Sequence, residues 1–524
     1  MKSEILKLRK KIYKNLKERA SRYEAPNQEL IEYQKDQNLH AKREFNLSSM
    51  EHLIEKVVDS QVIFLGDFHT FDQNIRNVLR IIKILVAQKS DCIIGLEMIS
   101  ASHQIYIDAY LQRHLTDLEF LESINYNQSW RFPWSHYKLI FELAKEHNLK
   151  IIGLNKKGSL ANRDRYAASL LTQSMLENQN SKILVLYGEL HITKNKIPLL
   201  LKEFYPEASN VIIHQNLDDI YWRLIKHFDL EQGIIQFTSN EFCIVSAPPW
   251  IKYESMIYWY ENLIDDPEFD IHEYIIETGA KIFVDDTYEN FLNISLELSN
   301  HLNLKITKED LEDFNLYDHT YLDYIEDKLE THLSAGLLSF YQYLLSTNKS
   351  FRFPNMPTFY CSSYSMNRIS YLAGIHILHH FLTQNNISSF EILNSKSSTK
   401  KFLLFCYEAI FAYFFSKIIN PHRKCDMYQD LSRKNTDYTV KAIKILEGQK
   451  VSQAVTGVKM KDYYEVALYV GHILGEYLYQ KANQKQAYRK IDLYINDISE
   501  THFLTLRDLI LKDEDYQVHS KRYF

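Results

Sequence analysis

Two stretches of this chain, VIFLGDFH at residues 62–69 and VLYGELH at residues 185–191, read almost as copies of each other. Each is an apolar run followed by a glycine, an acidic residue, one further residue and a histidine. In extended backbone, residues two apart point to the same side. Asp67 is therefore expected to accompany His69, and Glu189 to accompany His191. The repetition indicates two buried strands whose ends contribute to one polar pocket.

Short apolar runs alternate with helical segments between about residues 50 and 250. The runs are rich in β-branched residues and apolar on both faces, which is typical of strands in a mostly parallel sheet flanked by helices. They lie at residues 62–65, 92–96, 150–154, 183–187 and 211–214, and a further pair of strands is expected around 233–237 and 242–245. Segments 74–87 and 137–147 carry apolar residues at helical spacing. This half of the chain is therefore predicted to have an α/β fold.

The pattern changes after residue 250, where the apolar runs lengthen and follow a helical period. The longest runs lie at residues 289–298, 321–329, 337–345, 369–382, 402–415 and 463–474. We therefore expect three parts: a basic N-terminal helical extension at 1–45, an α/β domain at 46–250, and an all-α domain of unknown role at 251–524. In the last part, His376, His379 and His380 are expected to lie in the core, and His472 and Glu476 to pair within one helix or lie on the surface.

Composition excludes several classes of protein. The net charge of −6 with both signs well mixed gives no reason to expect a nucleic-acid partner. The five cysteines form no Cys-x-x-Cys pair, which is typical of a reducing compartment; they are Cys92, Cys243, Cys361, Cys406 and Cys425. No run of about 18 apolar residues was found, so no transmembrane segment is expected.

The basic start of the chain has no apolar signal region and no lipobox, so we expect a cytoplasmic location. It reads as an amphipathic helix. Such a helix either packs on the body of the protein or makes peripheral contact with a membrane surface or a partner.

Polar side chains follow the predicted strands at the edge where parallel sheets bind ligands. Glu97 follows the second strand and Asn155 the third, so they join the two acid-x-His segments there. Imidazole and carboxylate ligands suit Fe, Mn, Zn or Co, which makes His69, Glu97 and His191 candidate metal ligands. The same residues, with Asp67 and Glu189, can instead act as catalytic acids and bases without a metal.

The order of these and other short motifs resembles that of the ChaN-like haem-binding family, within the wider Tiki and erythromycin-esterase-like superfamily. The resemblance covers about residues 45–250. It rests on GDFH at 66–69, GLEM at 95–98, WSHY at 134–137, IIGLN at 151–155, RDRYA at 163–167, YGELH at 187–191 and IPLLL at 197–201.

The resemblance implies a pocket built from the two Gly-x-x-His segments and the glutamate of the second strand. By this resemblance, the expected site residues are His69, Glu97 and His191. Asp67 is added to them, at a position where the superfamily often has glutamate. Arg163 corresponds to an arginine expected to bind an anion or carboxylate. Asn155 and Tyr137 are the further candidates for cofactor binding.

Haem or iron binding, ligation of the haem iron by a tyrosine, and a homodimer are also implied by the resemblance. The ligating tyrosine lies outside the matched motifs, and the chain lacks the lipidation cysteine typical of these proteins.

Three functions stay open. The first is haem or iron binding at the sheet edge, with haem or another small molecule as ligand. The alternative is a hydrolase that uses the same edge, either with a divalent metal or by acid/base chemistry alone. The third is a non-enzymatic module whose helical half binds a protein partner. Whether the protein is an enzyme is therefore left undecided.

Overall fold

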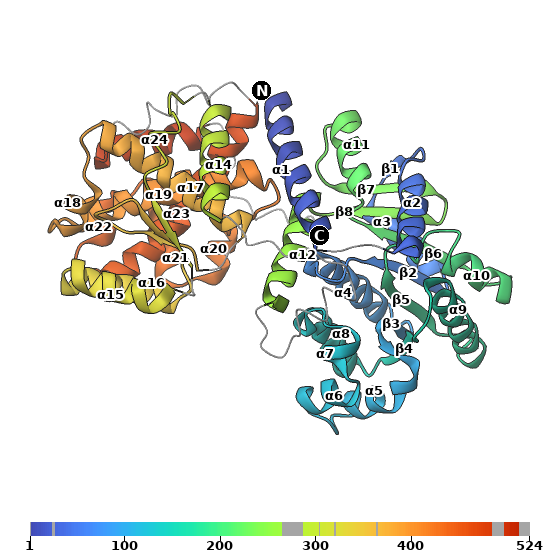
Figure 1. The fold of residues 1–524 in the computed structure, drawn as a ribbon. Helices are drawn as coiled ribbons and strands as arrows, with labels where there is room; N and C mark the ends of the chain where they lie inside the picture. The colour runs from blue at the N-terminus through green and yellow to red at the C-terminus, as the bar shows by residue number, and fades with distance from the viewer. Residues whose placement is uncertain are drawn as a thin grey trace. The chain divides into compact units, whose positions relative to one another are not determined.

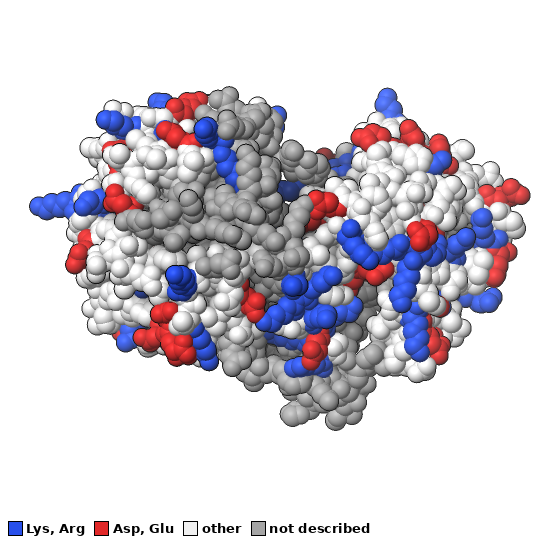
Figure 2. Space-filling view, turned by 90° about the horizontal axis from the view of Figure 1, so that it is seen from above, with Lys and Arg blue, Asp and Glu red and all other residues white. Residues whose placement is uncertain are grey.

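The computed structural model describes residues 2–23, 27–264, 287–302, 304–318, 321–362, 365–484 and 497–512. Contacts divide the chain into two compact units (Figure 1). We call residues 13–282 the α/β unit, and residues 1–12 with 283–522 the helical unit. On the face shown in Figure 2, basic and acidic side chains lie interspersed, as the mixed charge pattern predicts.

The α/β unit is built on an eight-stranded sheet with the order β1-β7-β8-β6-β2-β5-β3-β4. The central strands run parallel, whereas β7 is antiparallel to both of its neighbours. The strands are β1 (Asn46–Ser48), β2 (Val62–Asp67), β3 (Cys92–Ser100), β4 (Lys150–Asn155), β5 (Lys182–Gly188), β6 (Asn210–Gln215), β7 (Gly233–Thr238) and β8 (Glu241–Val245). The mostly parallel sheet and all seven predicted strands are confirmed; β1 was not predicted.

Helices flank this sheet as predicted. They are α2 (Gln28–Ala41), α3 (Met50–Asp59), α4 (Asp72–Ala87), α5 (Gln104–Leu111), α6 (Asp117–Ser123), α7 (Tyr126–Ser129), α8 (Trp134–His147), α9 (Leu160–Glu177), α10 (Ile197–Phe204), α11 (Asp218–Phe228) and α12 (Pro249–Ile264). Helix α1 (Lys2–Arg22) contains residues of both units. Ser159 is the N-cap of α9, and its side chain accepts a hydrogen bond from the Asn162 N–H.

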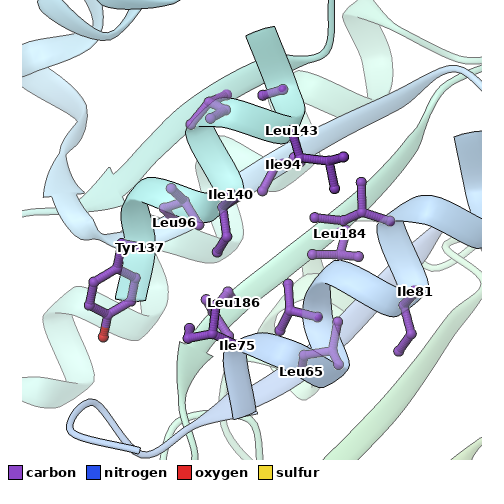
Figure 3. Packing of buried hydrophobic residues seen from close by; sticks show 14 of the residues in the cluster. Leu65, Ile75, Ile81, Ile94, Leu96, Tyr137, Ile140, Leu143, Leu184 and Leu186 are labelled. Atoms are coloured by element: carbon purple, nitrogen blue, oxygen red, sulfur yellow. The ribbon is translucent and has the colours of Figure 1, made fainter. Parts of the chain in front are cut away.

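Alternate residues of the central strands enter two apolar clusters, one on each face of the sheet. Ile63 and Leu65 of β2 pack with α4 and α8, whereas Val62 and Phe64 pack with α9 and α10. Figure 3 shows the first cluster, which contains Tyr137 of the first turn of α8 together with Leu96 and Leu186. Burial on both faces fixes how far each strand extends, and so places the strand ends at one edge of the sheet.

The helical unit is largely helical, as predicted. Its helices are α14 (Thr287–His301), α15 (Leu322–His332), α16 (Ala335–Ser346), α17 (Met366–Gln384), α18 (Ser389–Asn394), α19 (Ser398–Ile419), α20 (Tyr428–Lys434), α21 (Asp437–Leu446), α22 (Val451–Val455), α23 (Met460–Gln484) and α24 (Glu500–Leu511). A small sheet in the order β10-β11-β9 was not predicted; its strands are β9 (Asn315–Tyr317), β10 (Phe351–Arg352) and β11 (Thr358–Tyr360).

Helix α19 forms the core of the helical unit. Glycines let two neighbouring helices approach its backbone: a Cβ added at Gly374 of α17 would lie 2.8 Å from Ala412 Cα, and one at Gly475 of α23 would lie 2.7 Å from the Ile410 oxygen. Among the described residues, α19 is the single helix with the length and apolar composition needed to cross a membrane. However, 94% of its most apolar stretch is buried in the protein. That hydropathy, which the sequence analysis did not single out, is explained by its place in the core.

The histidine predictions for the helical unit have different outcomes. His376 and His379 are buried, as expected for core histidines, whereas His380 is only partly buried. His472 and Glu476 instead face other helices: the Glu476 carboxylate pairs with the Lys417 ammonium at 2.9 Å, and His472 Nε2 lies 3.5 Å from the Tyr371 hydroxyl. The predicted pairing within α23 is therefore wrong, because both residues lie on the side of α23 that faces α17 and α19.

Candidate functional site

The ends of β2 and β5 lie side by side. These strands are direct neighbours, with Asp67 in register with Gly188. On the other side of β5, β3 continues the sheet and carries Glu97 to the same edge. The two similar segments therefore reach one edge of the sheet, as the sequence predicted.

His69 is held by a carboxylate and a phenol. Its Nδ1 lies 2.9 Å from Asp67 Oδ2, and the Tyr137 hydroxyl donates to that same oxygen at 2.7 Å. The Asp67 side chain is buried, whereas 23% of the His69 side chain is exposed. The rings of Trp130 and Phe132 lie 4.6 and 4.7 Å from the imidazole, centre to centre. His69 is thus a partly open imidazole beside two aromatic rings.

His191 is held in the same manner by different elements. Its Nδ1 lies 2.5 Å from Asp164 Oδ1, and the Tyr33 hydroxyl donates to Asp164 Oδ2 at 2.8 Å. The rings of Tyr33 and Tyr187 contact the imidazole at 5.3 and 5.1 Å. Both histidines therefore end a Tyr–Asp–His chain in which Nδ1 faces a carboxylate. This leaves Nε2 of each ring as the atom available to a ligand.

Glu97 lies between the two imidazoles. One of its oxygens forms an ion pair with Arg163, and the other accepts a hydrogen bond from the Gly188 N–H at 2.6 Å. His191 Nε2 is 4.0 Å from the first oxygen. Although burial favours the neutral acid, the charges of His191, Arg163 and His69 lower the pKa of Glu97. The carboxylate is therefore held in its charged form.

Gly188 marks the centre of the site. A Cβ added there would lie 3.1 Å from Glu97 Oε2, 3.4 Å from His191 Cδ2 and 3.4 Å from His69 Cε1. Three of the predicted site residues thus surround one backbone position, and the absence of a side chain at that position leaves them room. Burial opposes a charge on His69, but its hydrogen bond to Asp67 and the charges of Asp67 and Glu97 raise its pKa.

Arg163 and Asn155 form a chain of contacts that ends at Glu97. Arg163 Nε donates to Asn155 Oδ1 at 3.0 Å while its Nη2 contacts Glu97. These two residues and Tyr137, the three predicted to bind a cofactor, therefore all lie close to the site. In this structure the guanidinium pairs with the protein's own Glu97 carboxylate, and its predicted role in cofactor binding stays a prediction.

Glu189 does not join the site, which corrects the sequence prediction. Its Oε1 lies 2.5 Å from His214 Nδ1, and its Oε2 accepts from the Gln215 N–H at 3.2 Å. The reason is local: β5 ends at Gly188, and the His191 N–H donates to the Gly188 oxygen at 2.9 Å to form a turn. Residues 189–191 are thus not extended, so the rule that places residues two apart on one side does not apply.

The metal-ligand prediction stays a prediction. His69, Glu97 and His191 lie together, but both Glu97 oxygens are engaged by Arg163 and Gly188. Among the residues that the structure describes, no group of three or more His, Cys, Asp or Glu side chains has the arrangement of a metal site.

Sequence reasoning missed Asp164 and Tyr33. Asp164 is adjacent to Arg163 in the RDRYA motif, so its position in a matched motif was an available signal. Tyr33 lies on α2, before the α/β domain as predicted from the sequence, and its role rests on a contact between distant segments.

Tyr33→Phe is expected to destabilise the α/β unit by about 1.5–3 kcal/mol, the usual value of a hydrogen bond to a charged group. The substitution leaves Asp164, which is 1% exposed, without this donor. Urea unfolding followed by tryptophan fluorescence measures the effect, because all five tryptophans lie in this unit. Tyr106→Phe, at an exposed tyrosine of α5, is the matched control; an equal effect of both substitutions contradicts the role of Tyr33.

A match to a family model supports the resemblance. Residues 53–163 match the model of a family described as haem-binding uptake, Tiki superfamily, ChaN. Among solved structures, the chain is similar to one titled "Cofacial heme binding to ChaN of Campylobacter jejuni", with 19% identity and a TM-score of 0.26; the similarity covers 32% of this chain and 87% of that one. No curated protein matches the sequence.

The matched segment runs from α3 to the first turn of α9. It includes His69, Glu97 and Tyr137, while His191 lies beyond it. Residues 53–163 therefore carry the signature of the ChaN family of the Tiki superfamily, as the order of the motifs predicted.

Proposed function

We propose that the sheet edge around Gly188 binds haem, with His69 as the residue that faces it. The carrying observation is that His69 is partly exposed while its Nδ1 is held by the buried Asp67. The match of residues 53–163 to a family described as haem-binding supports the same ligand class.

The chemistry of the residues present fits haem. Imidazole is a standard ligand of haem iron, so the proposal puts His69 in place of the tyrosine that the family resemblance implies. A carboxylate at Nδ1 raises the basicity of Nε2. The rings of Trp130 and Phe132 beside His69 provide apolar contact for a flat macrocycle. Bound haem would supply a redox-active iron centre. The task of the protein is to orient His69 and to hold the proton on its Nδ1 through Asp67 and Tyr137.

His69→Ala is expected to abolish saturable haem binding, because it removes the proposed ligand atom. Asp67→Asn is expected to weaken binding by about 10–100-fold, the usual effect of losing the partner that orients a ligating histidine. Titration of the purified full chain with haemin, followed by the Soret band, measures both effects. His114→Ala, at an exposed histidine after α5, is the control.

Two results would contradict the proposal. One is a folded wild-type protein that gives no saturable shift of the Soret band. The other is a His69→Ala protein that binds haemin as tightly as the His114→Ala control, since the ligand atom would then lie elsewhere.

A second candidate function, hydrolysis, is favoured by the two Tyr–Asp–His chains. A carboxylate that fixes an imidazole is the usual device for orienting a general base or a metal ligand. In this reading, His69 and His191 bind a divalent metal or activate water directly. Elemental analysis of the isolated protein should then find metal that is lost in His69→Ala and His191→Ala. Full metal content and activity in both variants would exclude it.

The remaining sequence predictions are retained as proposals. A reducing, cytoplasmic environment is consistent with five cysteines that form no disulfide, four of them buried. A homodimer is proposed on the family resemblance, and its test is the molar mass in solution. Peripheral membrane contact through the basic N-terminal helix is tested by co-sedimentation with anionic vesicles.

A further inference from the structure

The helical unit contains a hollow of its own. It has a volume of about 360 Å³, within the usual range for small-molecule sites. Helix α19 contributes Tyr413, and α23 contributes Tyr469 and His472. The segment between α19 and α20 contributes residues 423–426. The hollow is thus formed within the helical unit, by α19, α23 and the segment that follows α19.

Arg423 is a cation without a carboxylate partner in this hollow. Within the described part of the chain, its guanidinium makes one hydrogen bond, from Nη1 to the Asn367 oxygen at 3.0 Å, and no ion pair. Burial lowers the pKa of Arg423, in agreement with the lack of a carboxylate beside it among the described residues. Arg423 is partly buried, and charges removed from water are usually paired, so this guanidinium suits an anionic ligand.

The acidic groups nearby are already neutralised. Asp426 pairs with Lys434 at 2.6 Å, and Glu476 pairs with Lys417 at 2.9 Å. Neither carboxylate is therefore left to balance Arg423. The local excess of charge is positive, which favours a negative ligand.

The guanidinium is held in place before any ligand arrives. Its central carbon lies 5.1 and 5.2 Å from the ring centres of Tyr371 and Tyr413. The backbone oxygen of Arg423 accepts from Lys417 Nζ at 2.5 Å and from the Tyr413 hydroxyl at 3.2 Å. Such a fixed group loses little conformational entropy when it binds a ligand.

His472 adds a second donor to the lining. Burial and the charges of Arg423 and Lys349 lower its pKa to about 3, so the ring is neutral near pH 7. Its Nε2 lies 3.5 Å from the Tyr371 hydroxyl, which can donate to a neutral ring. The proton of the ring then resides on Nδ1, which makes that atom a hydrogen-bond donor.

We propose that this hollow is a second ligand site, which binds the carboxylate or phosphate group of a small molecule on the guanidinium of Arg423. Arginine suits this role because its planar N–H groups match both kinds of oxygen acceptor. The site belongs to the helical unit and does not depend on haem at the sheet edge.

The thiol of Cys425 provides the readout, because it lines the hollow and is partly exposed while the other four cysteines are buried. The full chain is treated with N-ethylmaleimide in phosphate, in benzoate or in chloride at equal ionic strength, and the modified peptide is measured by mass spectrometry. A bound anion should slow modification about tenfold at a concentration about ten times its Kd. Whichever of phosphate and benzoate protects at the lower concentration identifies the ligand class.

Benzamide is the uncharged control for benzoate, and Arg433→Gln, at an exposed arginine of α20, is the control for Arg423→Gln. We expect benzamide to give no protection, and Arg423→Gln but not Arg433→Gln to lose protection by the anion. Equal protection by benzamide and benzoate overturns the proposal, as does the lack of protection by either anion at millimolar concentration. The comparisons of the anions with chloride and of benzoate with benzamide use the wild-type chain, so they test the proposal even if Arg423→Gln fails to fold.

Discussion

Replacing Glu97 with alanine is expected to lower the free energy of unfolding of the α/β unit by about 3–5 kcal/mol, the usual cost of removing one partner of a buried ion pair. The Glu97 side chain is 4% exposed and that of Arg163 is 18% exposed. Without the carboxylate, the guanidinium keeps only its bond to Asn155 among the contacts described above. The buried Gly188 N–H also loses its acceptor.

Urea unfolding followed by tryptophan fluorescence measures this loss for the α/β unit alone, because the tryptophans are residues 130, 134, 222, 250 and 259. Glu122→Ala, at an exposed glutamate of α6, serves as the control and should change stability little. The stability of Glu97→Gln should lie between those of Glu97→Ala and Glu122→Ala, because an amide oxygen can still accept from the Gly188 N–H but carries no charge. A loss below about 1 kcal/mol in Glu97→Ala, the range of exposed pairs, would contradict the ion pair's importance.

The second large effect is a loss of stability in alkali, which we expect to be on the order of 3 kcal/mol between pH 6.5 and 9. It arises at His214 of β6, whose Nδ1 lies 2.5 Å from Glu189 and whose Nε2 lies 3.1 Å from Glu241. Burial opposes a charge on this ring, but the two carboxylates raise its pKa from 6.5 to about 9. The folded state therefore binds the proton more tightly than the unfolded state does.

The direction of the effect follows from this difference. Below pH 6.5 the ring of His214 is protonated in both states, and the full stabilisation is present. As the pH rises through about 9, the folded state also loses the proton and the stabilisation disappears. Urea unfolding at pH 6.5 and at pH 9 measures the difference.

His214→Gln is expected to be less stable than wild type at pH 6.5 and similar to it at pH 9. His52→Gln, at a more exposed histidine of α3, should keep the wild-type pH dependence. If His214→Gln loses as much stability between the two pH values as wild type does, other groups cause the effect. His69, whose pKa is also raised, would then be examined first.

The secondary structure was largely predictable because its signals are local. Apolar runs at residues 62–65 and 183–187 correspond to β2 and β5. The long helical periods after residue 250 correspond to α14, α15, α16, α17, α19 and α23, whereas the shorter helices α18, α20, α21 and α22 were not predicted. The small sheet of β9, β10 and β11 was missed, because strands of two or three residues are too short to show a period.

The site was predictable in part. The sequence placed His69, Glu97 and His191 at strand ends, and the structure brings them around Gly188. The prediction for Glu189 was wrong because the chain turns after Gly188 instead of continuing as an extended strand. The Glu189 carboxylate therefore contacts His214 and not His191. Asp164 replaces it as the partner of His191, from a helix that local periodicity cannot orient.

The amino-acid sequence by itself determined which residue types end the parallel strands, since strand boundaries follow from apolar runs and glycines nearby in the chain. Only the tertiary structure decided the partner of each side chain. Asp67 reaches His69 within one segment, but Tyr33 reaches Asp164 from α2 and Arg163 reaches Glu97 from α9. Such contacts depend on how distant segments pack, and no local pattern of residues specifies that packing.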